Sequence, residues 1–353
     1  MCKEYSIEEL VNTARSLRAS DIHIVCGIPI RLRIDGKLQN LDDRVMTPEN
    51  CEAYARELSG AYSEIEQIGE QDLALGLEDG TRCRVNLFRQ QGRVSAAIRI
   101  LNDHIPAFEE LGLPEQVARF TELKQGIVLI TGETGSGKST TLACLLDRIN
   151  HSQPKHIITL EDPIEYVYHS DQCIVNQREI GRDTRSYEDG LNAILREDPD
   201  VILIGEMRGL GTIETALVAA ETGHLVFATL HTNSAADTID RIVNVFPAAQ
   251  QPQIRMQLST CLQGVVCQQL LPHMSGKGRV LATEVMVVNA AIRNLIREGK
   301  TPQIANAMVT SGKNGCQMMD DCLMTLYRQR KITGDTAMKS AHNRDYMQRV
   351  TIF

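Results

Sequence analysis

The sequence contains no tryptophan, and aromatic residues make up only 4% of its 353 residues. Because single-stranded nucleic acids bind by stacking their bases on aromatic side chains, this composition offers few such surfaces. The formal net charge is −8, which also disfavours a surface that binds a phosphate backbone. We therefore expect no nucleic-acid partner.

Long apolar runs and clustered cysteines are absent as well. No run approaches the roughly 18 apolar residues that indicate a membrane span, and residues 1–5 lack the apolar stretch of a secretory signal. The 10 cysteines are scattered without a C-x-x-C pair, which disfavours a zinc site. These absences predict an intracellular protein without membrane insertion, and its length allows about two domains.

The most specific pattern present is GETGSGKST at residues 132–140, which fits Gly, four residues, Gly-Lys and then Ser or Thr. An apolar run at 127–130 precedes it and a helix-like stretch at 141–149 follows, which is the strand, loop and helix context that the motif requires. Such a loop surrounds phosphate groups with backbone N–H groups and a helix N-terminus. The predicted ligand residues are Gly132, Thr134, Gly135, Ser136, Gly137, Lys138, Ser139 and Thr140.

Two side chains of this loop have predicted roles toward a nucleoside triphosphate. Lys138 would reach the outer phosphates, and the Ser139 hydroxyl would ligate Mg²⁺. The expected cofactors are therefore ATP and Mg²⁺.

Downstream of the loop, predicted strands and helices alternate, which indicates a mostly parallel sheet flanked by helices. Ligands bind beyond the carboxyl ends of the strands in such sheets. Glu161, Glu165, Glu206 and His231 all follow predicted strands, so they could surround one nucleotide. A glutamate near the γ-phosphate can orient or deprotonate the attacking water, and spacing alone does not separate Glu161 from Glu165.

The first hundred residues predict a small α+β domain on an antiparallel sheet. Its last hairpin carries Arg82, Arg84, Arg93 and Arg99. One interpretation is a solvated sheet face, and the other is an arginine finger supplied to the triphosphate of a neighbouring subunit. We expect an N-terminal domain at 1–104, a linker at 105–120 and the nucleotide-binding domain at 121–353.

The C-terminal part yields three further expectations. Residues 253–271 are predicted to form one long helix, residues 280–288 a strand and residues 290–297 a helix. The tail from residue 340 is polar, and we expect it to be mobile.

Four segments together resemble the Asp-box, Walker B and His-box regions of the secretion ATPase superfamily. They are residues 159–165 (TLEDPIE), 195–208 (LREDPDVILIGEMR), 221–224 (ETGH) and 229–232 (TLHT). Within this superfamily the chain is similar to the PilT-type twitching-motility ATPases, which retract type IV pili. The segments ASDIH at 19–23 and AIRNLIRE at 291–298 match that group, and the resemblance covers nearly the whole chain.

The resemblance implies an α/β fold, with a RecA-like P-loop ATPase core and a smaller PAS-like α+β N-terminal domain. It also implies a hexameric ATP-hydrolysing motor that powers pilus retraction on an inner-membrane pilus platform protein. Such a motor is cytoplasmic and peripheral to the inner face of the cytoplasmic membrane.

By position, the resemblance assigns Glu165 as the general base and Glu206 as the Walker B acid beside Mg²⁺. It places His224 and His231 in the His box. The family's arginine positions are occupied by Arg82, Arg84 and Arg99.

The chain departs from the family at three positions. Gly209 and Gly211 stand where acids are usual, and Glu133 replaces a more usual proline. One alternative function is a pilus-extension or type II secretion ATPase, although those usually carry a four-cysteine zinc insert and a longer N-terminus. Others are a nucleotide-dependent binding switch with little turnover and a DNA-processing RecA-like protein.

Overall fold

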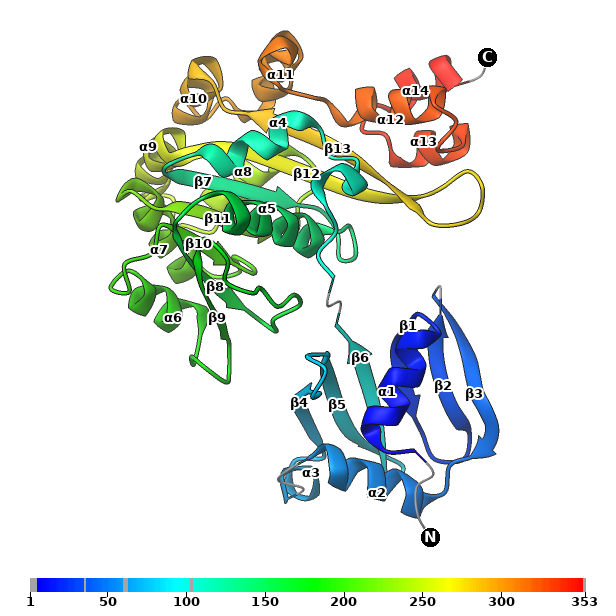
Figure 1. Cartoon of the computed structure of the whole chain (residues 1–353). Coiled ribbons are helices and arrows are strands. Elements are labelled where there is room, and N and C mark those ends of the chain that lie inside the picture. Colours follow the sequence, from blue (N-terminus) through cyan, green and yellow to red (C-terminus); the bar gives the residue numbers. More distant parts are fainter. Residues whose placement is uncertain (1–4, 35, 60–62, 102–103, 352–353) are drawn as a thin grey trace. The chain divides into compact units, whose positions relative to one another are not determined.

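The computed structural model describes residues 5–34, 36–59, 63–101 and 104–351. The chain divides into two compact units, Met1–His104 and Ile105–Phe353 (Figure 1). The segment 105–120, which we expected to be a linker, belongs to the second unit in the structure. Phe108 and Val117 of this segment are buried in the core of that unit.

The first unit is a six-stranded antiparallel sheet in the order β3-β2-β1-β6-β5-β4. Its strands are β1 (Ala19–Ile24), β2 (Pro29–Ile34), β3 (Lys37–Val45), β4 (Glu70–Gly76), β5 (Arg82–Gln90) and β6 (Arg93–Ile100). Its helices are α1 (Ile7–Ser16), α2 (Pro48–Leu58) and α3 (Ser63–Gln67). The α+β prediction for this region is confirmed.

Local sequence explains where α1 begins. The Ser6 hydroxyl accepts a 3.1 Å hydrogen bond from the Glu9 backbone N–H, and the Glu9 carboxylate accepts one of 2.8 Å from the Ser6 N–H. This is a capping box, which satisfies two N–H groups that would otherwise lack partners at the helix start. The buried side of the helix then packs on the apolar face of the sheet, where Ile22 and Ile98 are fully buried.

The second unit is a seven-stranded sheet in the order β13-β12-β7-β11-β10-β8-β9. All neighbouring pairs from β12 to β9 are parallel, and β13 is antiparallel to β12. The strands are β7 (Gly126–Thr131), β8 (His156–Glu161), β9 (Ile174–Glu179), β10 (Val201–Ile204), β11 (Leu225–Leu230), β12 (Leu262–Pro272) and β13 (Arg279–Val287). This mostly parallel α/β sheet confirms the predicted fold class.

Helices cover both faces of this sheet (Figure 1). They are η1 (Phe108–Leu111), α4 (Glu115–Ala118), η2 (Arg119–Glu122), α5 (Lys138–Ser152), α6 (Tyr187–Ile194), α7 (Leu210–Glu221), α8 (Ala235–Asn244), α9 (Gln251–Cys261), α10 (Ala290–Arg297), η3 (Thr301–Gln303), α11 (Ile304–Thr310) and η4 (Gly312–Asn314). Alternate strand residues point to opposite faces. Thus Leu129 packs in the cluster with α7 and α8, whereas Val128 packs in the cluster with α5.

The predicted helix over 253–271 is wrong in its second half. α9 ends at Cys261, and Leu262 begins β12, which lies between β7 and β13. The β-branched Val265 and Val266 are fully buried there. A short apolar run does not by itself distinguish a buried strand from a buried helix, and here the two flanking strands decide the outcome.

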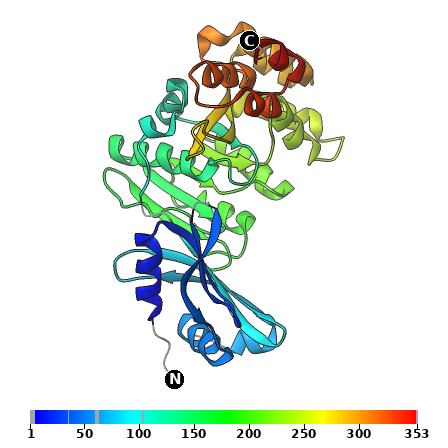
Figure 2. The ribbon, with the colours of Figure 1, turned by 90° about the vertical axis from the view of Figure 1, so that its right-hand side faces the viewer.

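The expectation of a mobile tail from residue 340 is also wrong for its described part. Three helices, α12 (Met319–Arg328), α13 (Gly334–Ser340) and α14 (Arg344–Thr351), gather beside the β12–β13 hairpin (Figure 1 and Figure 2). Met347 of α14 is completely buried in their common core with Leu271 of β12. Among the described residues, no helix has the length and apolar character to cross a bilayer.

Candidate active site

The phosphate loop connects β7 to α5 and depends on glycine at three positions. Gly132, Gly135 and Gly137 have φ angles of 139°, 80° and 91°, in the region that favours glycine. A Cβ atom added to Gly132 would lie 2.4 Å from the backbone oxygen of Gln268 in β12. The loop therefore needs glycine both for its backbone conformation and for its close approach to β12.

Lys138 is the first residue of α5 and is 9% exposed. Its Nζ donates hydrogen bonds of 2.8 and 2.9 Å to the backbone oxygens of Gly132 and Glu133, so the ammonium folds back over the loop. Burial lowers the pKa of Lys138, although the carboxylates of Glu206 and Glu165 act in the opposite direction. The cation thus lies where phosphate oxygens would replace the two carbonyl oxygens as its partners.

Glu206 follows β10 and shares one carboxylate oxygen between two neighbours. Its Oε1 lies 2.7 Å from Nε of Arg208 and 3.2 Å from Nε2 of His231, which follows β11. Burial alone would raise the pKa of Glu206, but the hydrogen bond and charge of Arg208, together with His231, bring it below its usual value. The carboxylate is therefore ionised at neutral pH.

The two glutamates after β8 differ in their surroundings. Glu161 is 8% exposed, and its Oε1 accepts hydrogen bonds of 2.7 Å from the Thr159 hydroxyl and 3.2 Å from the Gln177 amide. Burial raises its pKa to about 6. Glu165 is exposed, and its backbone N–H donates to the Glu161 carboxylate. The carboxylate of Glu161 is thus already engaged inside the protein, whereas Glu165 is exposed and its charge acts on the pKa of Lys138.

The two histidines of the expected His box lie at opposite ends of β11. His231 follows its carboxyl end and contacts Glu206, whereas His224 precedes its amino end and has Nδ1 3.0 Å from the Ala219 backbone oxygen. At about 3.3 Å per strand residue, the Cα atoms of His224 and His231 are roughly 23 Å apart. The structure therefore brings His231, but not His224, to the phosphate loop of the same chain.

The candidate arginines lie on the sheet of the first unit. Arg84 and Arg99 are opposite each other on β5 and β6, and both are exposed. Nε of Arg99 is 2.9 Å from Oδ1 of Asp21. Burial would raise the pKa of Asp21, but hydrogen bonds from Ser20 and Arg99 hold it below its usual value. Arg82 is half-buried at the start of β5. An arginine supplied to another subunit has to be presented on such a polar face.

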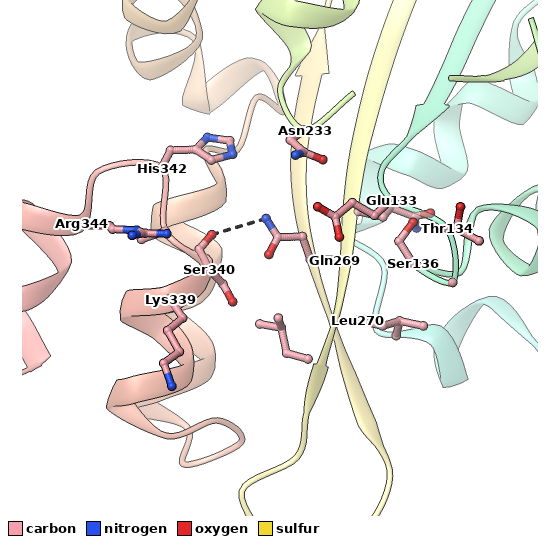
Figure 3. A pocket seen from close by; sticks show the side chains of 14 residues that line it. Glu133, Thr134, Ser136, Asn233, Gln269, Leu270, Lys339, Ser340, His342 and Arg344 are labelled. Carbon is pink, nitrogen blue, oxygen red and sulfur yellow. Dashed lines mark hydrogen bonds between the residues drawn. The ribbon is translucent and has the colours of Figure 1, made fainter. Parts of the chain in front are cut away.

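Sequence reasoning missed a pocket of about 420 Å³ that adjoins the phosphate loop (Figure 3). Its lining residues come from the loop, from the segment between β11 and α8, from β12, and from the region from the end of α13 to the start of α14: Glu133, Thr134, Gly135, Ser136, Asn233, Gln268, Gln269, Leu270, Leu271, Lys339, Ser340, Ala341, His342 and Arg344. The β12 residues were hidden by the incorrect helix prediction. The residues after 338 carried no motif that could have linked them to the loop.

The chain also offers groups that suit Mg²⁺ bound together with a nucleotide. Ser139 supplies a half-buried hydroxyl next to Lys138, and Glu206 supplies an ionised carboxylate. Mg²⁺ prefers oxygen ligands and usually takes only one or two from the protein, with phosphates and waters completing its shell. Across the described residues there is no group of three or more His, Cys, Asp or Glu side chains that could hold a metal ion by themselves.

A glycine-rich loop between a buried strand and a helix, with acids at neighbouring strand ends, defines a P-loop ATPase with a RecA-like core. The chain matches the family described as Type II/IV secretion system protein over residues 2–350, and it belongs to that family.

Three relatives illustrate the similarity. The chain is 44% identical to "Type IV pilus retractation ATPase PilT" of Pseudomonas aeruginosa over 337 residues, which covers 95% of this chain and 98% of that protein. It is 41% identical to "Twitching motility protein" of Neisseria gonorrhoeae over 348 residues, with 98% and 93% covered. The crystal structure of the pilus retraction motor PilT with bound ADP superposes with a TM-score of 0.92 at 48% identity, covering 98% of this chain and 100% of that one.

Proposed function

We propose that this chain is the ATP-hydrolysing motor of type IV pilus retraction. The observation that carries the proposal is the similarity, over almost the whole length of both chains, to proteins named for pilus retraction and twitching motility. The intact phosphate loop and the ionised Glu206 beside it support hydrolysis rather than passive binding of the nucleotide.

In this proposal the loop N–H groups and Lys138 hold the phosphates of ATP. Ser139 and Glu206 hold Mg²⁺, which offsets phosphate charge when it is bound. Glu165 orients the attacking water and accepts its proton, because its carboxylate is exposed near Lys138 whereas that of Glu161 is buried and hydrogen-bonded. His231 donates a hydrogen bond to the γ-phosphate from its position beside Glu206.

The remaining catalytic groups come from an adjacent subunit. Arg82, Arg84 and Arg99 stabilise the charge of the transferring phosphoryl group in the site of a neighbour, within a ring of six copies. Successive closure of the interfaces turns the ring against an inner-membrane pilus platform protein. The motor therefore works at the inner face of the cytoplasmic membrane.

Removal of the gene from its host tests retraction directly. Cells that extend pili but cannot retract them should carry more surface pili and lose twitching motility, and expression of the parent chain should restore movement. Expression of the Glu165→Gln variant serves as the control and should not restore it. If cells without the gene instead lose their surface pili, the motor drives extension and the retraction proposal is wrong.

A further inference from the structure

The pocket beside the phosphate loop lies between two segments that are far apart in the sequence. One wall is the tip of the loop, including Glu133 and Thr134, and the other is the segment 339–344, from the end of α13 to the start of α14. Figure 3 shows His342 and Arg344 on the opposite side of the pocket from Glu133, with Gln269 of β12 between them. The C-terminal segment thus faces the loop that binds the nucleotide.

Two buried polar atoms of this pocket have no hydrogen-bond partner within the described structure. They are Oγ of Ser136, in the phosphate loop, and Oε1 of Gln268, in β12. Gln268 is 1% exposed, and its amide nitrogen donates a 2.7 Å hydrogen bond to Thr141, which fixes the direction of the unpartnered oxygen. A buried polar group without a partner is unfavourable, so both atoms are available to hydrogen-bond a polar molecule that enters the pocket.

The buried carboxyl group of Glu284 contacts the C-terminal wall. Its side chain is 3% exposed, and Oε2 lies 3.6 Å from Nδ1 of His342. Oε1 accepts a 2.8 Å hydrogen bond from the Ala235 N–H at the start of α8, the helix that follows the His231 loop. One carboxylate on β13 therefore connects the C-terminal wall to the part of the chain that carries His231.

A second carboxylate fixes the backbone of the same segment. The two carboxylate oxygens of Asp320 accept hydrogen bonds of 2.8 and 3.0 Å from the N–H groups of His342 and Asn343. In addition, the Gln269 amide donates a 3.4 Å hydrogen bond to the Ser340 backbone oxygen (Figure 3). The wall is therefore tied to both β12 and β13 immediately before Arg344.

The charges of this wall suit an anionic ligand. Lys339, His342 and Arg344 line it, opposite a loop whose N–H groups and lysine are arranged for phosphate. Nζ of Lys339 lies 2.8 Å from Oδ2 of Asp335, so Arg344 is the better candidate to meet a ligand, and guanidinium groups bind phosphate oxygens well.

We propose that residues 339–344 form the second wall of the nucleotide site, with Arg344 contacting the bound nucleoside triphosphate and with Glu284 and Asp320 as positioning residues. This inference rests on the proposed function only in taking a nucleotide as the ligand of the loop. The C-terminal helices thereby become part of the site instead of a separate appendage.

Equilibrium binding of ATP and ADP to the full chain tests the contact. Arg344→Ala should raise the Kd for ATP and the KM of phosphate release about 5- to 20-fold while kcat changes less than about twofold, because a contact equal in ground and transition states affects binding alone. Arg344→Lys should recover part of the affinity. Arg349→Ala, an exposed arginine on the same helix outside the pocket, is the matched control and should behave as the parent.

Amide hydrogen exchange tests the positioning residues. Asp320→Asn should speed exchange of the His342 and Asn343 amides and raise the Kd for ATP, and bound ATP should slow that exchange in the parent. Glu284→Gln should act in the same direction; if it does not fold, Asp320→Asn decides the question. Parent-like Kd values for both Arg344→Ala and Asp320→Asn would overturn the inference. A parent chain that binds ATP but releases no phosphate would overturn the proposed function. The comparison of Kd values between the parent and the Arg344→Ala and Asp320→Asn variants would still test this inference.

Discussion

Nε2 of His231 lies 3.2 Å from Oε1 of Glu206, and Nε of Arg208 lies 2.7 Å from the same oxygen. The two partners of Glu206 come from different parts of the chain, because His231 follows β11 and Arg208 follows β10. The same imidazole can donate either to this carboxylate or to a γ-phosphate, so nucleotide binding would exchange one acceptor for another.

This exchange predicts different outcomes for the two histidines of β11. His231→Ala should lower kcat for ATP hydrolysis about 10- to 100-fold with little change in KM, because it removes a donor aimed at developing charge. His224→Ala should lower kcat much less, since this residue lies at the other end of the strand. Steady-state phosphate release measures both. Equal losses of kcat in the two variants would show that His224 also acts in catalysis, at a site formed between two subunits.

The surroundings of Glu161 and Glu165 predict which one is the base. Glu165→Gln should lower phosphate release at least about 100-fold and leave the Kd for ATP nearly unchanged, because general-base catalysis contributes about 10²–10⁴-fold. Glu161→Gln keeps a carbonyl oxygen for the Thr159 hydroxyl and should retain most activity. The reverse ranking of the two variants in a phosphate-release assay would transfer the role to Glu161.

The raised pKa of Glu161 predicts a pH-dependent stability. Burial moves this pKa from 4.5 to about 6, so the folded state favours the neutral form. The stabilising contribution of Glu161 to the free energy of unfolding is fully present below pH 4.5 and is lost as the pH rises through about 6. The loss amounts to about 2 kcal/mol. Denaturant unfolding of the parent and of Glu161→Gln should therefore show the variant gaining relative stability by that amount between pH 4 and 7. A pH-independent difference would contradict the assignment.

If one subunit supplies its arginines to the site of the next, mixing an arginine variant with a base variant should restore ATPase activity. The double variant Arg84→Ala/Arg99→Ala and the variant Glu165→Gln should each be nearly inactive, while nucleotide affinity is retained. In mixed rings about a quarter of the interfaces combine an intact base with intact arginines, so activity should reappear. Mixing followed by phosphate release measures this, with Arg93→Ala, on the same hairpin, as the control. Failure to regain activity would place the arginines outside the neighbour's site.

The two unusual glycines predict opposite responses to restoring an acid. Gly209 is the N-cap of α7 and has open space around it, so Gly209→Asp should stabilise the protein by a few tenths of a kcal/mol. A Cβ atom at Gly211 would lie 2.7 Å from the Glu188 carboxylate, and Gly211→Asp would add a like charge there. Because the exposed Glu188 side chain can move aside, the like charge is the main cost, and we expect a loss of a few tenths of a kcal/mol in denaturant unfolding. Equal stabilities of the two variants would be inconsistent with this packing.

The phosphate loop and the strand-end acids were predictable because their chemistry requires a short, local pattern. The loop glycines, Lys138 and the apolar run before them occupy adjacent positions, and the structure shows the strand, loop and helix that this pattern predicts. Spacing alone did not separate Glu161 from Glu165, because their different surroundings depend on burial and on the Gln177 side chain from another strand.

The C-terminal wall of the pocket could not be predicted for a related reason. Its position depends on Glu284, a buried acid within a strand, and on His342, which belongs to a polar tail with no periodic pattern. The Ala235 N–H donates a hydrogen bond to this acid and His342 lies 3.6 Å from it, and both contacts exist only in the folded protein. Such a contact between distant segments leaves no local signal in either of them.

The pairing of β5 with β6 has a consequence for insertions and deletions. Arg84 faces Arg99 on the polar side of the sheet, while Val85 faces Ile98 on the apolar side. Adding or removing a single residue within β6 would reverse these directions and bring a guanidinium into the core. Natural length changes should therefore be confined to the turn after Gln90, since any change within the strands would damage folding and the presentation of the arginines together.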